Sequence, residues 1–369
     1  MRYLFVVQGE GRGHLTQALS LKSMLERNGH EVVAVMAGSS RKCILPDYFT
    51  QKVGREVIQF QSPNFLPAPK GKNVPLLFSV LYNLLYLPVY LNSMLTINRT
   101  IKQMQPDVVI NFYELMCGFT YGFFKPKPPM INVAHQYYFL TPEFCYTGNN
   151  VWQFRLLNFY SKLTAWNASK ILALSFRYNK TLSFGKISIV PPLLRKEVKS
   201  MEPRHGNYIH GYMLNSGYAE KLAAWSSDNQ HQPLHFFWDR MLADEKKLTP
   251  QLTMHQLSDT AFLHYMAGCK AYATTAGFES VCEAMYLQKP ILMVPVHIEQ
   301  ECNAIDALAS KAGVTACDFD LDLLLGFLPD FKPNLKFKHW VHSSESVFLY
   351  ELTQNLSENS IAMGVSITL

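Results

Sequence analysis

Residues 271–304 read AYATTAGFESVCEAMYLQKPILMVPVHIEQECNA and predict a strand, a turn and a helix, followed by a second strand, turn and helix. The β-prone run 271–275 is followed by Gly277, and apolar residues at helical spacing come next, so a helix begins just after that glycine. The apolar run 291–296 after Pro290 is typical of a parallel strand that is buried on both faces. The stretch therefore predicts a doubly wound α/β fold.

The turn at Gly277 has the features of a phosphate site. Free amides at a helix start attract phosphate, and a glycine without a Cβ lets an anion approach the backbone. Ser280 offers a hydroxyl donor one turn into the helix, and Glu283 can accept the two vicinal hydroxyls of a ribose. Glu299 and Gln300 follow the second strand, at the edge where open α/β sheets bind ligands, and both can bind sugar hydroxyls.

Together with Pro290 and the Asn303-Ala304 pair, these residues resemble the donor signature of GT-B glycosyltransferases in families 1 and 28. The resemblance implies the GT-B fold of the α/β class, in which two Rossmann-like domains face a central cleft. In these families the glycine turn and the serine hold the diphosphate, the glutamate binds the ribose, and the acidic residue and the glutamine bind the donor sugar. The implied donor set is completed by Thr275, Phe278 and Phe262, the last of which lies where relatives cover the base.

The resemblance also implies a reaction. A hexose moves with inversion from a nucleotide-diphosphate sugar, with UDP as the expected nucleotide, to a hydroxyl of a glycan or a lipid-linked acceptor. Because the helix start supplies a positive field for the departing diphosphate, no metal is expected, and no cofactor besides the donor substrate. Glu279 stands where many relatives have Asn or a small residue, and a carboxylate beside a diphosphate is unfavourable.

A second glycine-rich loop, Gly9-Glu-Gly-Arg-Gly-His14, follows a predicted strand at 3–7 and precedes a helix that ends near residues 28–29. Its G-x-G-x-G spacing lacks the third position of a dinucleotide site, which argues against a redox enzyme. The loop resembles the N-terminal motif of the same families, in which the glycines face the diphosphate and the histidine lies at the reaction centre. Gly11 and Gly13 are thus assigned to donor binding, and His14 is a catalytic base or, alternatively, a structural hydrogen bonder.

The predicted strands 107–112 and 130–134 both end in polar residues, which converge on the cleft of a doubly wound sheet. The sequence here looks like a bacterial family 1 branch that commonly carries Asp where this chain has Asn111. The acidic function is therefore assigned to Glu114 as a second catalytic candidate, and the alternative is a structural carboxylate. His135 and Gln136, after the second of these strands, are assigned to the acceptor side.

The length of 369 residues exceeds the usual single core and favours two domains. We expect an N-terminal acceptor domain at 1–192, a linker at 193–206, a C-terminal donor domain at 207–330, and a tail at 331–369 that relatives send back across the domains. Arg195 in the linker is interpreted as solvated or as facing the cleft. Further strands are predicted at 31–36, 57–61, 170–175, 187–190, 208–214 and 234–238, a helix near 219–225, and another element at 256–265.

The composition narrows the functional class and the compartment. A net charge of +6 without a dense basic block gives little support to nucleic-acid binding and suits anionic substrates or an anionic membrane. The seven cysteines form no C-x-x-C pair, and residues 1–7 lead directly into a strand without an export signal, so we expect a cytoplasmic protein. The acidic residues at 318, 320 and 322 are interpreted as a solvated loop and not as a metal site.

Residues 74–97 contain no charged side chain, which would permit a membrane span by length alone. Pro88 interrupts the run and leaves helical pieces of about a dozen residues, too short to cross. Flanking cations at 70, 72, 99 and 102 allow a peripheral contact with an anionic membrane, at the inner face of the cell membrane. The alternative is a helix pair that is buried against the first domain.

Two other functions share the predicted donor site. A nucleotide-sugar 2-epimerase would have the same architecture and would need no acceptor. A non-catalytic nucleotide-sugar-binding protein would bind the donor without turnover.

Overall fold

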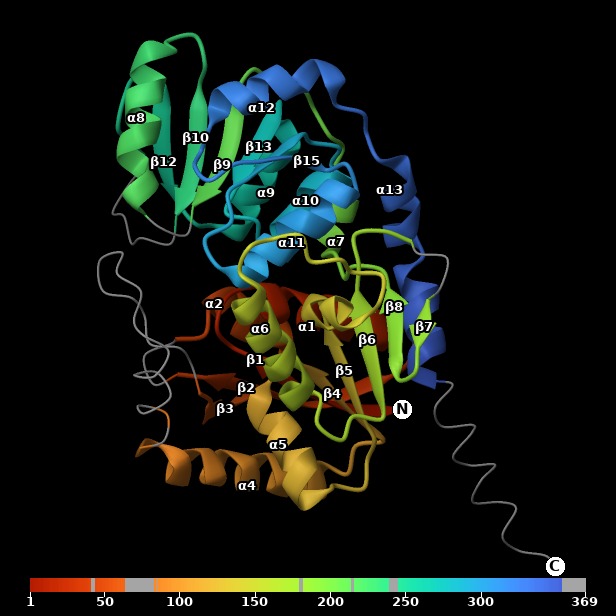
Figure 1. The fold of residues 1–369 in the computed structure, drawn as a ribbon. Helices are drawn as coiled ribbons and strands as arrows, with labels where there is room; N and C mark the ends of the chain where they lie inside the picture. Colours follow the sequence, from red (N-terminus) through yellow and green to blue (C-terminus); the bar gives the residue numbers. More distant parts are fainter. Residues whose placement is uncertain are drawn as a thin grey trace, which may run out of the picture.

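The computed structural model describes residues 1–40, 44–63, 83, 85–178, 182–213, 216–238 and 245–353. It contains two α/β domains, each built on one mostly parallel sheet with helices on its faces, and Figure 1 shows one domain above the other. This arrangement confirms the predicted class of two Rossmann-like domains.

Within the described residues, the N-terminal sheet has eight strands in the order β3-β2-β1-β4-β5-β6-β8-β7. Neighbouring strands are parallel except for β7 and β8. The strand order reverses between β1 and β4, which is the point where open α/β sheets bind ligands. The strands are β1 (Arg2–Gln8), β2 (Glu31–Ser39), β3 (Val57–Gln61), β4 (Val108–Phe112), β5 (Met130–Ala134), β6 (Lys170–Leu174), β7 (Ser183–Phe184) and β8 (Ile187–Val190).

The helices of this domain place the glycine loop at the sheet edge. Helix α1 (Gly13–Arg27) begins inside the loop and buries an apolar face that includes Leu15, Leu21 and Leu25. It ends as predicted near Gly29, whose φ of +76° is favourable for glycine. The other described helices are α2 (Asp47–Val53), α4 (Leu87–Met104), α5 (Leu115–Phe124), the 3₁₀ helix η2 (His135–Leu140) and α6 (Val151–Thr164).

The described part of the C-terminal sheet has seven strands in the order β11-β12-β10-β9-β13-β14-β15. They are β9 (Ile209–Met213), β10 (Leu234–Trp238), β11 (Lys246–Lys247), β12 (Leu252–Gln256), β13 (Ala271–Thr274), β14 (Ile291–Met293) and β15 (Gly313–Thr315). The helices are the short η3 (Ser216–Tyr218) and η4 (Leu328–Asp330), with α8 (Ala219–Asp228), α9 (Asp259–Gly268), α10 (Phe278–Tyr286), α11 (Ile298–Ala309) and α12 (Leu321–Phe327). The predicted strand, turn and helix around Gly277 are thus β13, a loop and α10.

Two segments join the domains. The short helix α7 (Lys196–Lys199) lies in the linker, and α13 (Leu335–His342) packs against α10. Contact with the N-terminal domain begins within α13, where Trp340 Nε1 donates to Ser175 O at 3.2 Å, and continues beyond the helix, where Glu351 pairs with Lys170. Figure 1 shows this blue segment running down beside β7 and β8.

The helix is interrupted beside Pro88, as predicted: residue 85 is helical, Tyr86 lies in a turn, and α4 begins at Leu87. Pro88 occupies the first turn of α4, where a missing N–H costs nothing because the amides have no helical partner. At 18 residues α4 is longer than the predicted dozen, because it continues to Met104, beyond the apolar run. Tyr90, Met94 and Ile97 are buried against the sheet and α5, whereas Leu87 and Leu91 are exposed. Residues 74–82 and 84 of the predicted membrane-contacting segment lie outside the described residues. Among the helices that the structure describes, none combines the length and apolar character required for a membrane span.

Other elements were missed or misplaced by sequence periodicity. Strand β12 and helix α6 were not predicted, and the element expected at 256–265 is α9, shifted toward its C-terminus. Strand β14 ends at Met293, two residues before Pro295, which cannot donate a ladder hydrogen bond. In the predicted acidic loop, Asp320 accepts a hydrogen bond from Leu323 N at 2.9 Å and caps α12, while Asp318 pairs with Lys221.

Candidate active site

The glycine corner of the C-terminal domain has room beside the Cα of Gly277. Gly277 is the N-cap residue of α10, and the preceding Ala276 has a φ of +59°, which turns the chain sharply after β13. A Cβ built on Gly277 would meet only Ser280 Oγ within 4 Å, at 3.7 Å. The Ser280 hydroxyl donates to Gly277 O at 3.1 Å and must rotate to donate to a ligand. Room therefore exists beside Gly277, at the end of a helix whose first amides have no helical partner.

The start of α1 lies directly opposite this corner. Gly13 opens the helix, and the direction of its missing Cβ points to Glu279 Cγ, 3.4 Å away. Gln17 Nε2 donates to Glu279 Oε1 at 2.6 Å and so links the two domains. Burial raises the pKa of Glu279 to about 8, so the carboxyl is mostly protonated at neutral pH. The unusual glutamate is therefore nearly neutral beside the corner.

His14 is buried in the first turn of α1. Its Nδ1 lies 3.3 Å from Gln17 Oε1, and its Nε2 lies 3.5 Å from Gln136 Nε2. Because Gln17 Oε1 can only accept and the Gln136 amide can only donate, these contacts assign the Nδ1–H tautomer, with the lone pair on Nε2. Burial lowers the pKa of His14, and the opposing effect of Glu299 is smaller. The imidazole is neutral at neutral pH, as a general base requires.

Glu114 lies in a different environment from His14. Its carboxylate caps α5 by accepting from Met116 N at 3.0 Å, and it accepts from Ser62 Oγ at 2.6 Å. The side chain is fully buried, and burial raises its pKa to about 7. Among the hydrogen bonds that the described residues form, none joins Glu114 to His14, and the carboxylate that influences His14 is Glu299. The geometry corresponds to the structural alternative for Glu114.

His135 and Gln136, predicted on the acceptor side, occupy the contact between the domains. The ring of His135 stacks on Phe278, the first residue of α10, with centroids 3.9 Å apart, and only 2% of His135 is exposed. Its Nδ1 lies 2.7 Å from Leu174 O, and burial lowers its pKa to about 3. His135 thus supports the glycine corner by packing against Phe278, whereas Gln136 contacts His14.

The predicted ribose residue, Glu283, is held by a residue of the linker. Arg195 Nε donates to Glu283 Oε1 at 2.6 Å, and Arg195 Nη2 donates to Oε2 at 3.0 Å. Glu283 is 1% exposed, and Arg195 also lies 3.6 Å from Asp259. Burial alone would lower the pKa of Arg195, but Glu283 outweighs it and raises the pKa above its usual range. In the sequence, the only signal for this contact is that Arg195 is the first charged residue after the apolar run 191–194.

The residues predicted to bind the donor sugar lie at the start of α11. Glu299 Oε1 accepts from Gln136 Nε2 at 2.9 Å, which places this carboxylate one side chain away from His14. Gln300 is buried, and its Oε1 accepts from Val296 N at 2.9 Å. The next residue, Glu301, accepts from Tyr146 and Asn150 in a clamp that the sequence did not predict. These contacts bring Glu299 and Gln136 together across the domains.

The remaining predicted donor residues differ in accessibility. Gly11 is exposed at the tip of the N-terminal loop with a φ of +82°. Thr275 is buried next to the glycine corner. Phe262 is 6% exposed and packs in the core beside His210 and Phe237, where its ring supports the start of α9. Arg12 reaches that helix start and pairs with Asp259 at 3.1 Å, a contact that was not predicted.

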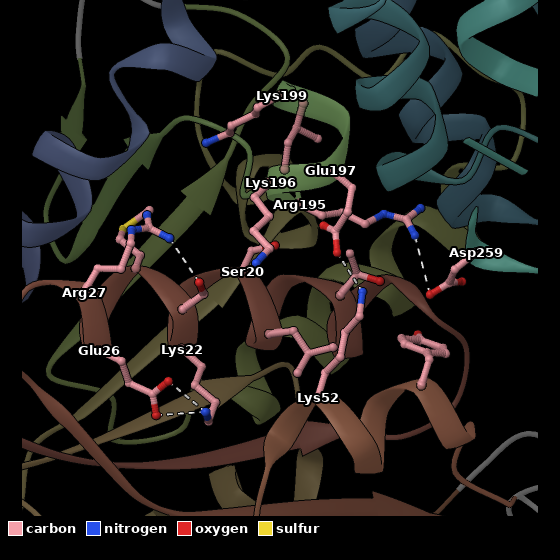
Figure 2. Close-up of a pocket in the computed structure, with 16 residues that line it drawn as sticks. Ser20, Lys22, Glu26, Arg27, Lys52, Arg195, Lys196, Glu197, Lys199 and Asp259 are labelled. Carbon is pink, nitrogen blue, oxygen red and sulfur yellow. Dashed lines mark hydrogen bonds and ion pairs between the residues drawn. The ribbon is translucent and has the colours of Figure 1, made fainter. Parts of the chain in front are cut away.

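A basic cavity adjoins the site on the linker side. Its volume is about 300 Å³, and it is enclosed by α1, α2 and α7. Figure 2 shows that Arg195 and Asp259 stand at one end of it and that lysines from all three helices project toward it. Most of the cations have acidic partners, as in the Lys52–Glu197 pair at 2.8 Å. The linker arginine that holds Glu283 is therefore reachable by solvent from this side.

The chain was compared with family models, curated proteins and solved structures. A family model described as glycosyl transferase family 1 matches residues 1–331. No curated protein matches the sequence. Among solved structures, the chain is similar to the glycotransferase of kitacinnamycin, at 12% identity and a TM-score of 0.65, covering 95% of this chain and 98% of that one.

Two further structures are similar over their whole length. Phytolacca americana UGT2, complexed with UDP-2fluoro-glucose and pterostilbene, is 14% identical with a TM-score of 0.60, and the match covers 98% of this chain and 99% of that one. The spinosyn rhamnosyltransferase SpnG is 14% identical with a TM-score of 0.60, over 95% of this chain and 100% of that one. These likenesses establish the GT-B fold.

Proposed function

The chain belongs to glycosyl transferase family 1 and is a glycosyltransferase, and on that premise we propose that it moves a sugar from a UDP-linked donor to an acceptor hydroxyl with inversion. The observation that carries the proposal is the open corner at Gly277, which faces the start of α1 with His14 in its first turn. An inverting transfer needs a site for the leaving diphosphate, which we assign to the corner at Gly277, and a neutral base, which we assign to His14 at the start of α1.

The diphosphate is proposed to bind at the amides that open α10. The helix start has a partial positive charge that stabilises the negative charge developing on the leaving group. Because Glu279 is mostly protonated at neutral pH, it adds little repulsion. Arg195 supplies a fixed positive charge behind Glu283. With these groups the transfer is proposed to proceed without a metal.

The ribose is proposed to bind Glu283 beside Arg195. Arg195 occupies one site on each carboxylate oxygen, and a carboxylate has about four acceptor sites in total. Two ribose hydroxyls can therefore donate to Glu283 without displacing the guanidinium.

In the proposed mechanism, His14 Nε2 takes the proton of the acceptor hydroxyl. The acceptor oxygen replaces the Gln136 amide, which lies 3.5 Å from Nε2, and Gln17 holds the Nδ1–H on the other side of the ring. The Glu299 carboxylate stabilises the imidazolium that forms, because it already opposes the fall in the pKa of His14. The oxygen then attacks the anomeric carbon on the face opposite the diphosphate, and the C–O bond to the diphosphate breaks.

The acceptor is proposed to be a glycan or a lipid-linked molecule, handled in the cytoplasm at the inner face of the membrane. A peripheral contact through residues 74–97 belongs to this proposal. Leu85, Leu87 and Leu91 support it because 80%, 56% and 51% of these side chains are exposed.

A donor screen tests the proposal. Thermal unfolding is measured with nucleoside diphosphates and their sugars, because a ligand at 100 times its Kd adds about 2.7 kcal/mol of stability. We expect stabilisation by UDP and a UDP-sugar, and loss of that response in Gly277→Val. Product formed from the donor alone would favour the 2-epimerase, and binding without turnover on a broad acceptor panel would favour a nucleotide-sugar-binding protein. No response to any nucleotide would refute the assignment of the corner.

A further inference from the structure

The charges of this chain are divided unequally along its length. Residues 57–196 contain fourteen lysines and arginines and only three acidic residues, whereas the whole chain has 34 basic and 28 acidic residues. One of those three, Glu114, is fully buried. Helices α4, α5 and α6 belong to this segment, so the net charge of +6 conceals a strongly basic half of the N-terminal domain.

Helix α6 concentrates part of this charge on one face. Within α6, Trp152, Arg155, Phe159 and Lys162 follow one another at intervals of three or four residues, which is the spacing of one helical face, and Trp166 follows in the turn directly after the helix. The aromatic members are 72%, 58% and 41% exposed, and both cations are exposed. The opposite face, with Ser161 and Thr164, is buried in the domain. The outward face therefore alternates bulky aromatic rings with positive charges.

This face continues onto α5. Phe123 is 64% exposed, and its ring lies 5.1 Å from that of Trp166. Lys125 and Lys127 follow it on the surface. We call Trp152, Arg155, Phe159, Lys162, Trp166 and Phe123 the aromatic-basic face. Figure 1 shows α6 extending from the level of α11 down to α5.

We propose that the aromatic-basic face binds the surface of an anionic lipid bilayer. Tryptophan and phenylalanine rings enter the boundary between headgroups and acyl chains, while arginine and lysine remain at the level of the phosphates. Several exposed aromatic side chains on one helix face are unusual for a surface that meets only water. A polynucleotide is less favoured, because only two of the six side chains of this face are cations that could neutralise phosphates.

The aromatic-basic face lies close to the candidate active site. Its upper end begins directly after Asn150, whose side chain donates to Glu301 at the start of α11, at 3.0 Å. A bilayer bound along α6 therefore lies next to the donor-sugar residues of α11. The following inference rests on the proposed function. The acceptor that suits this arrangement has an apolar part that stays in the membrane and a hydroxyl that enters the site.

Vesicle sedimentation with the full chain tests the proposal. The probes are vesicles of phosphatidylcholine alone and of phosphatidylcholine mixed with phosphatidylglycerol. Two variants change the face, Trp152→Ala/Phe159→Ala and Arg155→Gln/Lys162→Gln. Their matched controls are Leu335→Ala/Tyr350→Ala, at side chains that are 57% and 58% exposed, and Lys246→Gln/Lys247→Gln on the exposed strand β11.

We expect the wild type and both controls to sediment with the anionic vesicles and to remain in solution with the neutral ones. Loss of two cations near the surface should weaken binding by about 30-fold at moderate salt, and the aromatic variant should lose binding at least as strongly. Equal binding by variants and controls, or binding to RNA in place of vesicles, would overturn the proposal. UDP-induced stabilisation, measured on the same samples without lipid, reports separately on the proposed function.

Discussion

Replacing Arg195 by methionine tests whether the linker stabilises Glu283, the carboxylate that is proposed to bind the ribose. The pair is bidentate, at 2.6 and 3.0 Å, and Glu283 is 1% exposed. Methionine keeps the apolar stem of the arginine and removes only the guanidinium. The variant leaves a buried carboxylate without its partner, which costs about 3–5 kcal/mol, or roughly 10 °C in Tm for a domain of this size.

A double-mutant cycle separates this effect from general damage. Glu283→Gln should cost less, because the freed guanidinium of Arg195 retains Asp259 at 3.6 Å and its side chain is 15% exposed. In Arg195→Met/Glu283→Gln the buried charge is gone, so the loss of stability should be well below the sum of the single losses. Additive losses in thermal and urea unfolding would refute the reasoning. Glu283→Ala should also destabilise, because it removes the carboxylate that holds Arg195.

Three further predictions concern the corner. Glu279→Gln should reduce the pH dependence of Tm. The unfolded carboxyl ionises near 4.5 and the folded one near 8, so this group alone costs the wild type up to about 1.4 kcal/mol per pH unit across that window. The variant lacks this loss and keeps the separate one that arises from Glu114 and Asp306, so parallel Tm curves would contradict the assignment. His14→Ala should lower kcat by about 10²–10⁴-fold and leave the UDP affinity unchanged in calorimetry, and near-full turnover would exclude the base. Gly277→Val should abolish UDP binding with an unchanged Tm, because its φ of −67° suits any residue and its Cβ has room; unaltered UDP affinity would place the diphosphate elsewhere.

The elements around the corner were predictable because their signals are local. The order of strand, glycine, helix and apolar strand depends on residues within one turn or one strand of each other, and β13, α10 and β14 follow it. The spacing of Ser280 and Glu283 from Gly277 follows from helix geometry alone. The break beside Pro88 was predictable for the same reason, because proline disfavours a helix interior and favours a helix start, and α4 begins one residue before it.

Contacts between the domains were beyond sequence reasoning. Gln17 meets Glu279 across 262 positions, and Arg195 meets Glu283 across 88, so no periodicity connects the partners. Glu114 shows the converse problem. A carboxylate after a strand end resembles a catalytic acid in the sequence, but its own helix start captures it as an N-cap. The helix start that could favour a ligand site thus holds this side chain as its own N-cap.

The pairing of acidic residues across the domains determines how a donor can enter. On the C-terminal side the partners are Asp259 with Arg12, Glu279 with Gln17, Glu283 with Arg195, Glu299 with Gln136, and Glu301 with Tyr146 and Asn150. Under the proposed function, a nucleotide sugar exchanges contacts more than it adds them, and we expect the domains to separate before it binds. The clamp on Glu301 opposes that separation. It also favours the closed state, in which His14 and the proposed diphosphate corner face each other, so we expect one contact to slow donor entry and to assist the chemical step.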